Sequence, residues 1–182
     1  MVWFAFSYGG AILGYLAVNA AAARLLEERY GYFVIALTVS TVVGQLALVG
    51  VHRGGLREAA RLQPDDLDTL RDLRRGVRVV TLLTLPLAAV GAAGGTYLLL
   101  GDVTPGSRVT VALGMGVLVW LGGHQKLWAN YLRGFGQVRF ASLLEGRSGG
   151  SIVSLGQALA IVAVLLFRPG WGLAGALAAL AV

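Results

Sequence analysis

The feature that most constrains this 182-residue chain is a series of long segments without Asp, Glu, Lys or Arg. These charge-free runs cover 2–23, 30–52, 79–101, 109–125 and 148–167, and each is close to the ~20 residues with which a helix crosses a bilayer core. In the whole chain 57% of residues are hydrophobic and only 13% are charged, which is more apolar than a soluble domain requires. The sequence therefore predicts an all-α integral membrane protein.

Five to six transmembrane helices are expected in a single domain that covers 1–182. The first run has neither a basic flank nor a small-residue cleavage site and is read as a retained helix. The last apolar segment is too short to cross, so we expect either a chain cut inside a sixth helix or a half-membrane segment. The predicted spans are about 2–23, 32–52, 79–100, 109–131 and 149–167, with a partial span at 172–182.

Basic residues are unevenly distributed among the connecting segments. Eleven of the 15 lie in 53–78 and 126–147, and four lie in the alternate loops. Because cytoplasmic loops are enriched in Lys and Arg, both rich segments and the N-terminus are predicted to be cytoplasmic, in a multi-pass protein of the inner (cytoplasmic) membrane. The net charge of +6 sits beside apolar runs, which favours anionic membrane lipids over nucleic acid as a partner.

The segment 53–78 is predicted to be a cytoplasmic loop with an interfacial helix that feeds into the third span. In "QPDDLDTLRDLRRGVR" the aspartates precede the arginines, as the helix dipole favours. Leu67, Leu70, Leu73 and Val77 recur at helical spacing, which is typical of a helix that lies in the membrane interface. The arginines either anchor this helix to anionic lipid, the favoured reading, or steer an anionic substrate.

A polar stripe follows the fourth span. Lys126, Asn130, Arg133 and Gln137 recur at steps of four, three and four, in line with Gly116 and Gly123. Lys126 lies about 25 Å along a helix that starts near Val109, so it either snorkels to the headgroups or belongs to a hydrated vestibule.

Other spans carry weaker polar lines. Their members either line a shared wet interior or join helices by hydrogen bonds. The spacings Gly10/Gly14 and Gly91/Gly95 favour close helix packing, and Pro86 is expected to kink the third span. The polar lines are Thr38, Thr41, Gln45 and His52, continued by Arg53, Arg57 and Arg61 if the helix passes Gly54 and Gly55; Ser151, Ser154 and Gln157; and Tyr8, Tyr15 and Asn19.

The residue inventory argues against catalysis. The chain has no cysteine and two histidines, which leaves no ordinary metal cluster, and no nucleophile–base pair stands out. We therefore expect neither an enzyme nor a cofactor. The charge-free runs hold no carboxylate of the kind that proton- or sodium-coupled transport of a cation commonly uses, which favours an anionic cargo.

Residues 24–58, "RLLEERYGYFVIALTVSTVVGQLALVGVHRGGLRE", resemble the start of the polysaccharide-biosynthesis, or oligosaccharide flippase, family of the MOP superfamily. Glu28, Tyr30 and Gly31 fit the turn after its first helix, Gly50 fits the glycine that ends its second helix, and Arg57 fits an arginine several residues further on. "YLRGFGQVRFASLLEG" is similar to the stretch after the fourth helix, through Arg133, Gly134 and Gly136, and "GWGLAGALAAL" is similar to the entry to the sixth helix.

This resemblance implies one lobe of a two-lobed flippase, which moves lipid-linked oligosaccharide across the cytoplasmic membrane for cell-surface polysaccharide synthesis. The polyprenyl pyrophosphate would meet Arg57, Lys126 and Arg133, and the sugars would meet Asn130, Gln45 and Gln157. A glycan polymerase or glycosyltransferase would be a further partner. The alternatives are a MATE-like small-molecule exporter and a non-transporting membrane scaffold of a glycan-assembly complex.

Overall fold

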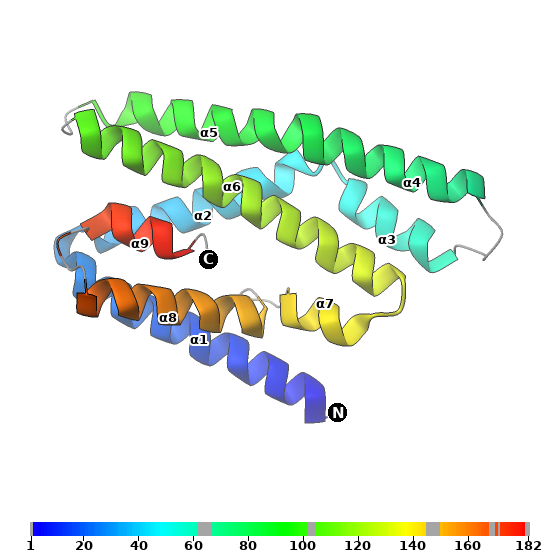
Figure 1. The fold of residues 1–182 in the computed structure, drawn as a ribbon, viewed down its shortest axis with the longest axis horizontal. Coiled ribbons are helices and arrows are strands. Elements are labelled where there is room, and N and C mark those ends of the chain that lie inside the picture. The colour runs from blue at the N-terminus through cyan, green and yellow to red at the C-terminus, as the bar shows by residue number, and fades with distance from the viewer. Residues whose placement is uncertain are drawn as a thin grey trace.

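The computed structural model describes residues 2–61, 67–101, 105–144, 150–167, 170 and 172–180, and every regular element in these ranges is a helix (Figure 1). The all-α class is confirmed. The elements are α1 (Val2–Leu26), the 3-10 turn η1 (Glu27–Arg29), α2 (Tyr30–Ala47), α3 (Val51–Arg61), α4 (Leu67–Val79), the π-turn η2 (Val80–Thr84), α5 (Leu85–Leu99), α6 (Pro105–Gly134), α7 (Val138–Leu144), α8 (Ser151–Phe167) and α9 (Gly172–Leu180).

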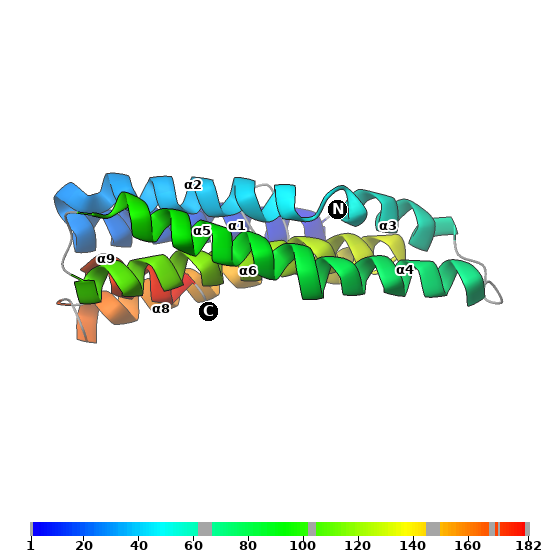
Figure 2. The same cartoon turned by 90° about the horizontal axis from the view of Figure 1, so that it is seen from above.

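The helices form an elongated bundle around α6, which packs against α2, α3, α5, α7 and α9. The α1–α2 and α5–α6 connections lie at one end of the bundle, whereas α3, α4, the α6–α7 turn and the N-terminus lie toward the other (Figures 1 and 2). The two arginine-rich segments are thus at the same end of the bundle.

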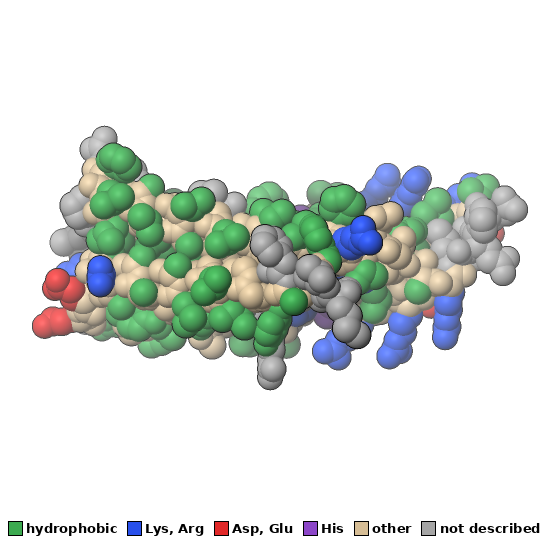
Figure 3. Space-filling model, turned by 90° about the horizontal axis from the view of Figure 1, so that it is seen from below, with side chains coloured by type: hydrophobic (Ala, Val, Ile, Leu, Met, Phe, Trp, Pro, Cys, Tyr) green, Lys and Arg blue, Asp and Glu red, His purple; other side chains and the backbone are tan. Residues whose placement is uncertain are grey.

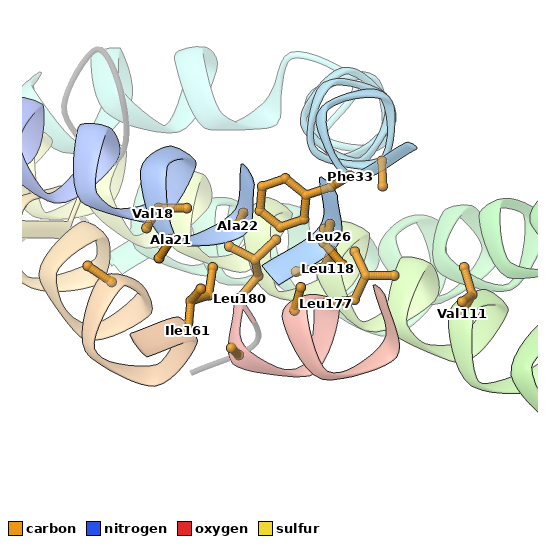
Figure 4. Close-up of a cluster of buried hydrophobic side chains, with 14 of the residues drawn as sticks. Val18, Ala21, Ala22, Leu26, Phe33, Val111, Leu118, Ile161, Leu177 and Leu180 are labelled. Carbon is orange, nitrogen blue, oxygen red and sulfur yellow. The ribbon is translucent and has the colours of Figure 1, made fainter. Parts of the chain in front are cut away.

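Two apolar clusters hold the bundle together. The larger joins α1, α2, α6, α8 and α9, and its fully buried members include Phe33, Ile161 and Leu177 (Figure 4). The smaller joins the end of α2 to α3, α4, η2, α5 and α6, and Leu127 and Leu85 within it are fully buried. The second cluster attaches the α3–α4 pair to the rest of the molecule.

Glycines set the closest helix contacts. A Cβ on Gly14 would lie 2.7 Å from the Ser154 Cβ, so α1 and α8 touch backbone to backbone. This agrees with the close packing predicted for Gly10 and Gly14. The same prediction is wrong for Gly91 and Gly95, which are exposed and where an added Cβ would meet no neighbour within 4 Å, because α5 turns this side away from α6.

The second predicted span is interrupted where it meets the arginine-rich segment. α2 ends at Ala47, Val49 and Gly50 adopt positive φ values of 47° and 76°, and α3 begins at Val51. The helix does continue through Gly54 and Gly55, so Arg53, Arg57 and Arg61 recur at steps of four on α3. His52, however, is buried, whereas Thr38, Thr41 and Gln45 are exposed, so the polar line does not pass unbroken from α2 into α3. That part of the predicted stripe is wrong.

α4 forms where predicted and runs into α5 without interruption, from Leu67 to Leu99. It continues the direction of α5 instead of lying across its end (Figure 2). Leu73 is buried, Leu70 and Val77 are half-buried, and Leu67 is exposed. The π-turn η2 stands just before Pro86, whose missing N–H and bulky ring are incompatible with a regular preceding turn.

Two continuous helical segments of the described chain, Ser7–Ala47 and Leu67–Leu99, are long and apolar enough to cross a membrane. Ser7–Ala47 reverses direction at η1, where Glu27 has φ 46°, so it comprises two antiparallel helices (Figure 1). In Leu67–Leu99 only 17% of the most apolar window is buried. Most of that surface therefore faces outward.

Candidate functional site

The candidate site lies where α6 leaves the apolar part of the bundle and meets α3 and α4. Tyr131 on α6 is its structural centre: its phenol donates a hydrogen bond of 3.1 Å to the Leu73 carbonyl on α4. Its ring lies against α3 at Gly55, where a Cβ would come within 2.9 Å of the ring. One aromatic side chain thus fixes three helices.

The contact between Tyr131 and Leu73 also shows at which level along the bundle axis the charged residues lie. Lys126 precedes Tyr131 by five residues, and Arg78 follows Leu73 by five in the antiparallel α4, so both lie about 7.5 Å nearer the apolar part of the bundle. Gly134 packs against Leu56 and Ala59, which places Arg57 at the level of Arg133. We call the residues at these levels the basic belt: Arg53, Arg57, Arg71, Arg74, Arg75, Arg78, Lys126 and Arg133.

Three of the predicted site residues share one face of α6. Lys126 and Arg133 are half-buried, and Asn130 is 8% exposed and donates its Nδ2 to the Lys126 carbonyl at 2.9 Å. Gln137 was predicted on the same face, and this is wrong. α6 ends at Gly134 and the chain turns at Gly136, where φ is 76°. Gly123, which the spacing predicts on the same line, packs against Leu85 on α5.

The other predicted site residues lie on different surfaces. Arg57 is exposed on the side of α3 opposite Gly55 and Ala59, which face α6. Gln45 is exposed in the last turn of α2. Gln157 is half-buried on α8 and donates its Nε2 to the Leu180 carbonyl at 2.7 Å, which joins α8 to the end of α9.

The weaker polar lines do not meet in one wet interior. Thr38 and Thr41 are exposed and bond to carbonyls of their own helix, at 2.9 and 2.8 Å. Ser151 and Ser154 are buried beside the glycines of α1, which agrees with a packing role. Tyr8 and Tyr15 are exposed on α1.

A groove of about 380 Å³ separates α3 from α4, and the sequence interpretation missed it. Its lining includes two carboxylates, Glu58 and Asp72, and the Tyr131 side chain. A sequence signal exists, since Gly54 and Glu58 share one helix face and so do Asp72 and Gly76. The other lining residues are Val51, Gly55, Thr69 and Leu73.

Several predicted positions lie outside the described residues, namely Pro64, Asp65, Asp66, Arg147 and Arg168. No protein-family model, no curated protein and no solved structure matches this chain.

Proposed function

We propose that the chain is an integral membrane protein with five to six spans, and that the α3–α4 hairpin is on the cytoplasmic side. The supporting observation is the separation of charged from apolar surface (Figure 3). Arg24, Glu27, Glu28 and Arg29 gather at one end of the bundle with Arg108, and the basic belt is near the other. Between them the exposed side chains are largely apolar, including Leu46, Leu82 and Val90 at 70% exposure or more.

The dimensions of this apolar zone fit a bilayer. α2 has 18 residues, or about 27 Å, against a hydrocarbon core of about 30 Å. From Lys126 to Arg133 the basic belt spans about 10 Å, somewhat more than the roughly 5–8 Å of one headgroup layer. Exposed aromatic side chains stand near both boundaries, as in the aromatic belts of membrane proteins: Trp3 and Trp128 toward the basic end, Tyr32 and Tyr97 toward the other.

Cysteine labelling tests the membrane arrangement directly, because the chain has no native cysteine. With a membrane-impermeant maleimide on intact cells, Glu28→Cys should react and Asp68→Cys should react only after the membrane is opened. Val90→Cys should react slowly in both cases, since it would face lipid. If Val90→Cys reacts as fast as Glu28→Cys in intact membranes, the membrane proposal is wrong.

Within this arrangement we infer that the chain supplies one lobe of a flippase for lipid-linked oligosaccharide. The inference rests on the Lys126–Asn130–Arg133 face together with the resemblance in sequence. Two half-buried cations flank a buried amide at the edge of the apolar zone. A polyprenyl pyrophosphate has its multiple negative charges at that same boundary, where fixed cations can hold them without a covalent step.

Binding to a polyprenyl pyrophosphate tests this function at the level of its recognition chemistry. The purified protein should bind undecaprenyl pyrophosphate more tightly than uncharged undecaprenol, and Lys126→Gln should weaken the pyrophosphate complex by about tenfold. Arg24→Gln, an exposed change at the opposite end, is the matched control and should have no effect.

Transport is measured separately, in liposomes that contain a labelled lipid-linked oligosaccharide. Movement across the bilayer above that in protein-free liposomes supports the flippase. Binding without movement favours the scaffold alternative, and equal binding of the charged and uncharged lipids defeats the assignment of Lys126.

A further inference from the structure

We propose that the groove between α3 and α4 binds an alkylammonium group, such as the headgroup amine of phosphatidylethanolamine. The site is separate from the Lys126 face and has the opposite charge preference. It does not depend on the flippase proposal, but the choice of a lipid headgroup rests on the proposed membrane arrangement. Its volume of about 380 Å³ lies near the lower limit of the ~300–1,000 Å³ usual for ligand pockets, which suits a small headgroup.

The lining offers what a substituted ammonium ion requires. Glu58 from α3 and Asp72 from α4 present carboxylates to one groove, and Tyr131 adds an aromatic ring. Carboxylates attract the charge and accept its N–H groups, and aromatic rings attract cations through their π faces. Val51 and Leu73 supply an apolar wall for the adjacent methylene groups.

Both carboxylates are available to a ligand. Neither Glu58 nor Asp72 forms an ion pair within the described part of the chain, in contrast to Asp68, whose carboxylate is 3.1 Å from the Arg71 guanidinium. None of the seven arginines on α3 and α4 lines the groove. Among the described residues no cluster of three or more His, Cys, Asp or Glu side chains could hold a metal ion.

The groove is open, and its Tyr131 side is held in place. The hydrogen bond to Leu73 holds Tyr131 in place, and Gly55 allows the ring to lie against α3. A Cβ added at Gly54 would meet no atom within 4 Å, so a side chain there would enter free space. A larger residue at position 54 can therefore fill the groove without displacing a neighbour.

The surroundings favour a lipid headgroup over a free amine. The arginines on the outer faces of α3 and α4 repel a simple cation, but they attract a ligand that carries a phosphate beside its ammonium group. Phosphatidylethanolamine has both charges, at the membrane level where the basic belt lies. We therefore expect it to bind more tightly than free ethanolamine.

The experiment is a lipid titration of the purified full chain by native mass spectrometry. The probes are phosphatidylethanolamine, its N-acetylated form, phosphatidylglycerol and free ethanolamine as a competitor. Glu58→Gln and Asp72→Asn should each weaken phosphatidylethanolamine binding by about tenfold, because each removes a charged hydrogen-bond acceptor. Gly54→Leu should have a similar effect by filling the groove, and Asp68→Asn is the matched acidic control.

The outcomes are distinct. A headgroup site is supported if the Glu58 and Asp72 variants no longer prefer phosphatidylethanolamine to its N-acetylated form. Their binding of phosphatidylglycerol should be unchanged. If free ethanolamine competes for the site as efficiently as phosphatidylethanolamine binds it, the ammonium site is supported with a soluble amine as its source. If the Glu58→Gln/Asp72→Asn double variant binds phosphatidylethanolamine as the parent does, the proposal is overturned.

Discussion

The hydroxyl group of Tyr131 on α6 bonds to the backbone carbonyl of Leu73 on α4, 58 residues away in sequence. This is a buried contact between the apolar bundle and the α3–α4 hairpin. The hairpin projects along the bundle axis, so this tyrosine helps to determine whether the arginines of α4 are held at the level of Lys126.

Tyr131→Phe should destabilise the protein by about 0.5–1.5 kcal/mol, the usual net contribution of one hydrogen bond. Thermal unfolding in detergent measures the change, and limited tryptic digestion should show faster cleavage in the hairpin. Tyr32→Phe is the control, because Tyr32 is 62% exposed. Equal stability of both variants would show that the bond to Leu73 contributes nothing.

Substitution by alanine at two adjacent glycines of α3 should change the stability of the protein in opposite directions. Gly55→Ala places a methyl group 2.9 Å from the Tyr131 ring and should destabilise the protein by about 1–3 kcal/mol, as overpacking does. Gly54→Ala meets no neighbour within 4 Å and should stabilise α3 by up to about 1 kcal/mol through helix propensity. Unfolding midpoints of the pair compare them directly, and similar shifts would contradict the placement of the ring.

A second pair of glycines tests the contact between α1 and α8. Gly14→Ala would bring a Cβ to 2.8 Å from the Ser154 carbonyl carbon, so the two backbones must separate, at a cost of about 1–3 kcal/mol. Gly9 on the same helix has open space, and Gly9→Ala should be neutral or stabilising. The midpoint of thermal unfolding gives the comparison. A neutral Gly14→Ala variant would mean that α1 does not touch α8 as described.

The helical class is predictable from the sequence because uncharged runs of about 20 residues leave few other solutions. The path of the chain between those runs is less predictable. The resemblance placed a helix end at Gly50, where φ is 76°, but Val49 carries no signal for positive φ and a β-branched residue there is disfavoured, so the left-handed residue before the glycine could not be anticipated. At Gly91 and Gly95 the sequence suggested a close helix contact that the structure lacks, because a small-residue spacing does not say which side of a helix has a neighbour.

The candidate site was predictable only within one helix. Lys126, Asn130 and Arg133 share a face because helical periodicity determines it. The position of a residue on α2, α3 or α8 relative to this face depends on how each helix is rotated in the bundle. Gln45, Arg57 and Gln157 therefore could not be placed from spacing. Glu58 and Asp72 were missed because their common groove arises from two helices, and neither is conspicuous alone.

The break at Val49 provides the last prediction. A left-handed conformation costs an L-residue about 1–2 kcal/mol, and Val49 is 70% exposed, so little burial is lost when its side chain is removed. Val49→Gly should therefore stabilise the protein by about 1 kcal/mol, less than the full strain because glycine also gains freedom in the unfolded chain. Val42→Gly is the control: Val42 is likewise exposed but helical, so the same substitution there should destabilise the protein by about 0.5 kcal/mol.

If the unfolding midpoints of the two variants shift in opposite directions, the break between α2 and α3 is supported. If both variants are destabilised, α2 continues as a regular helix through Val49.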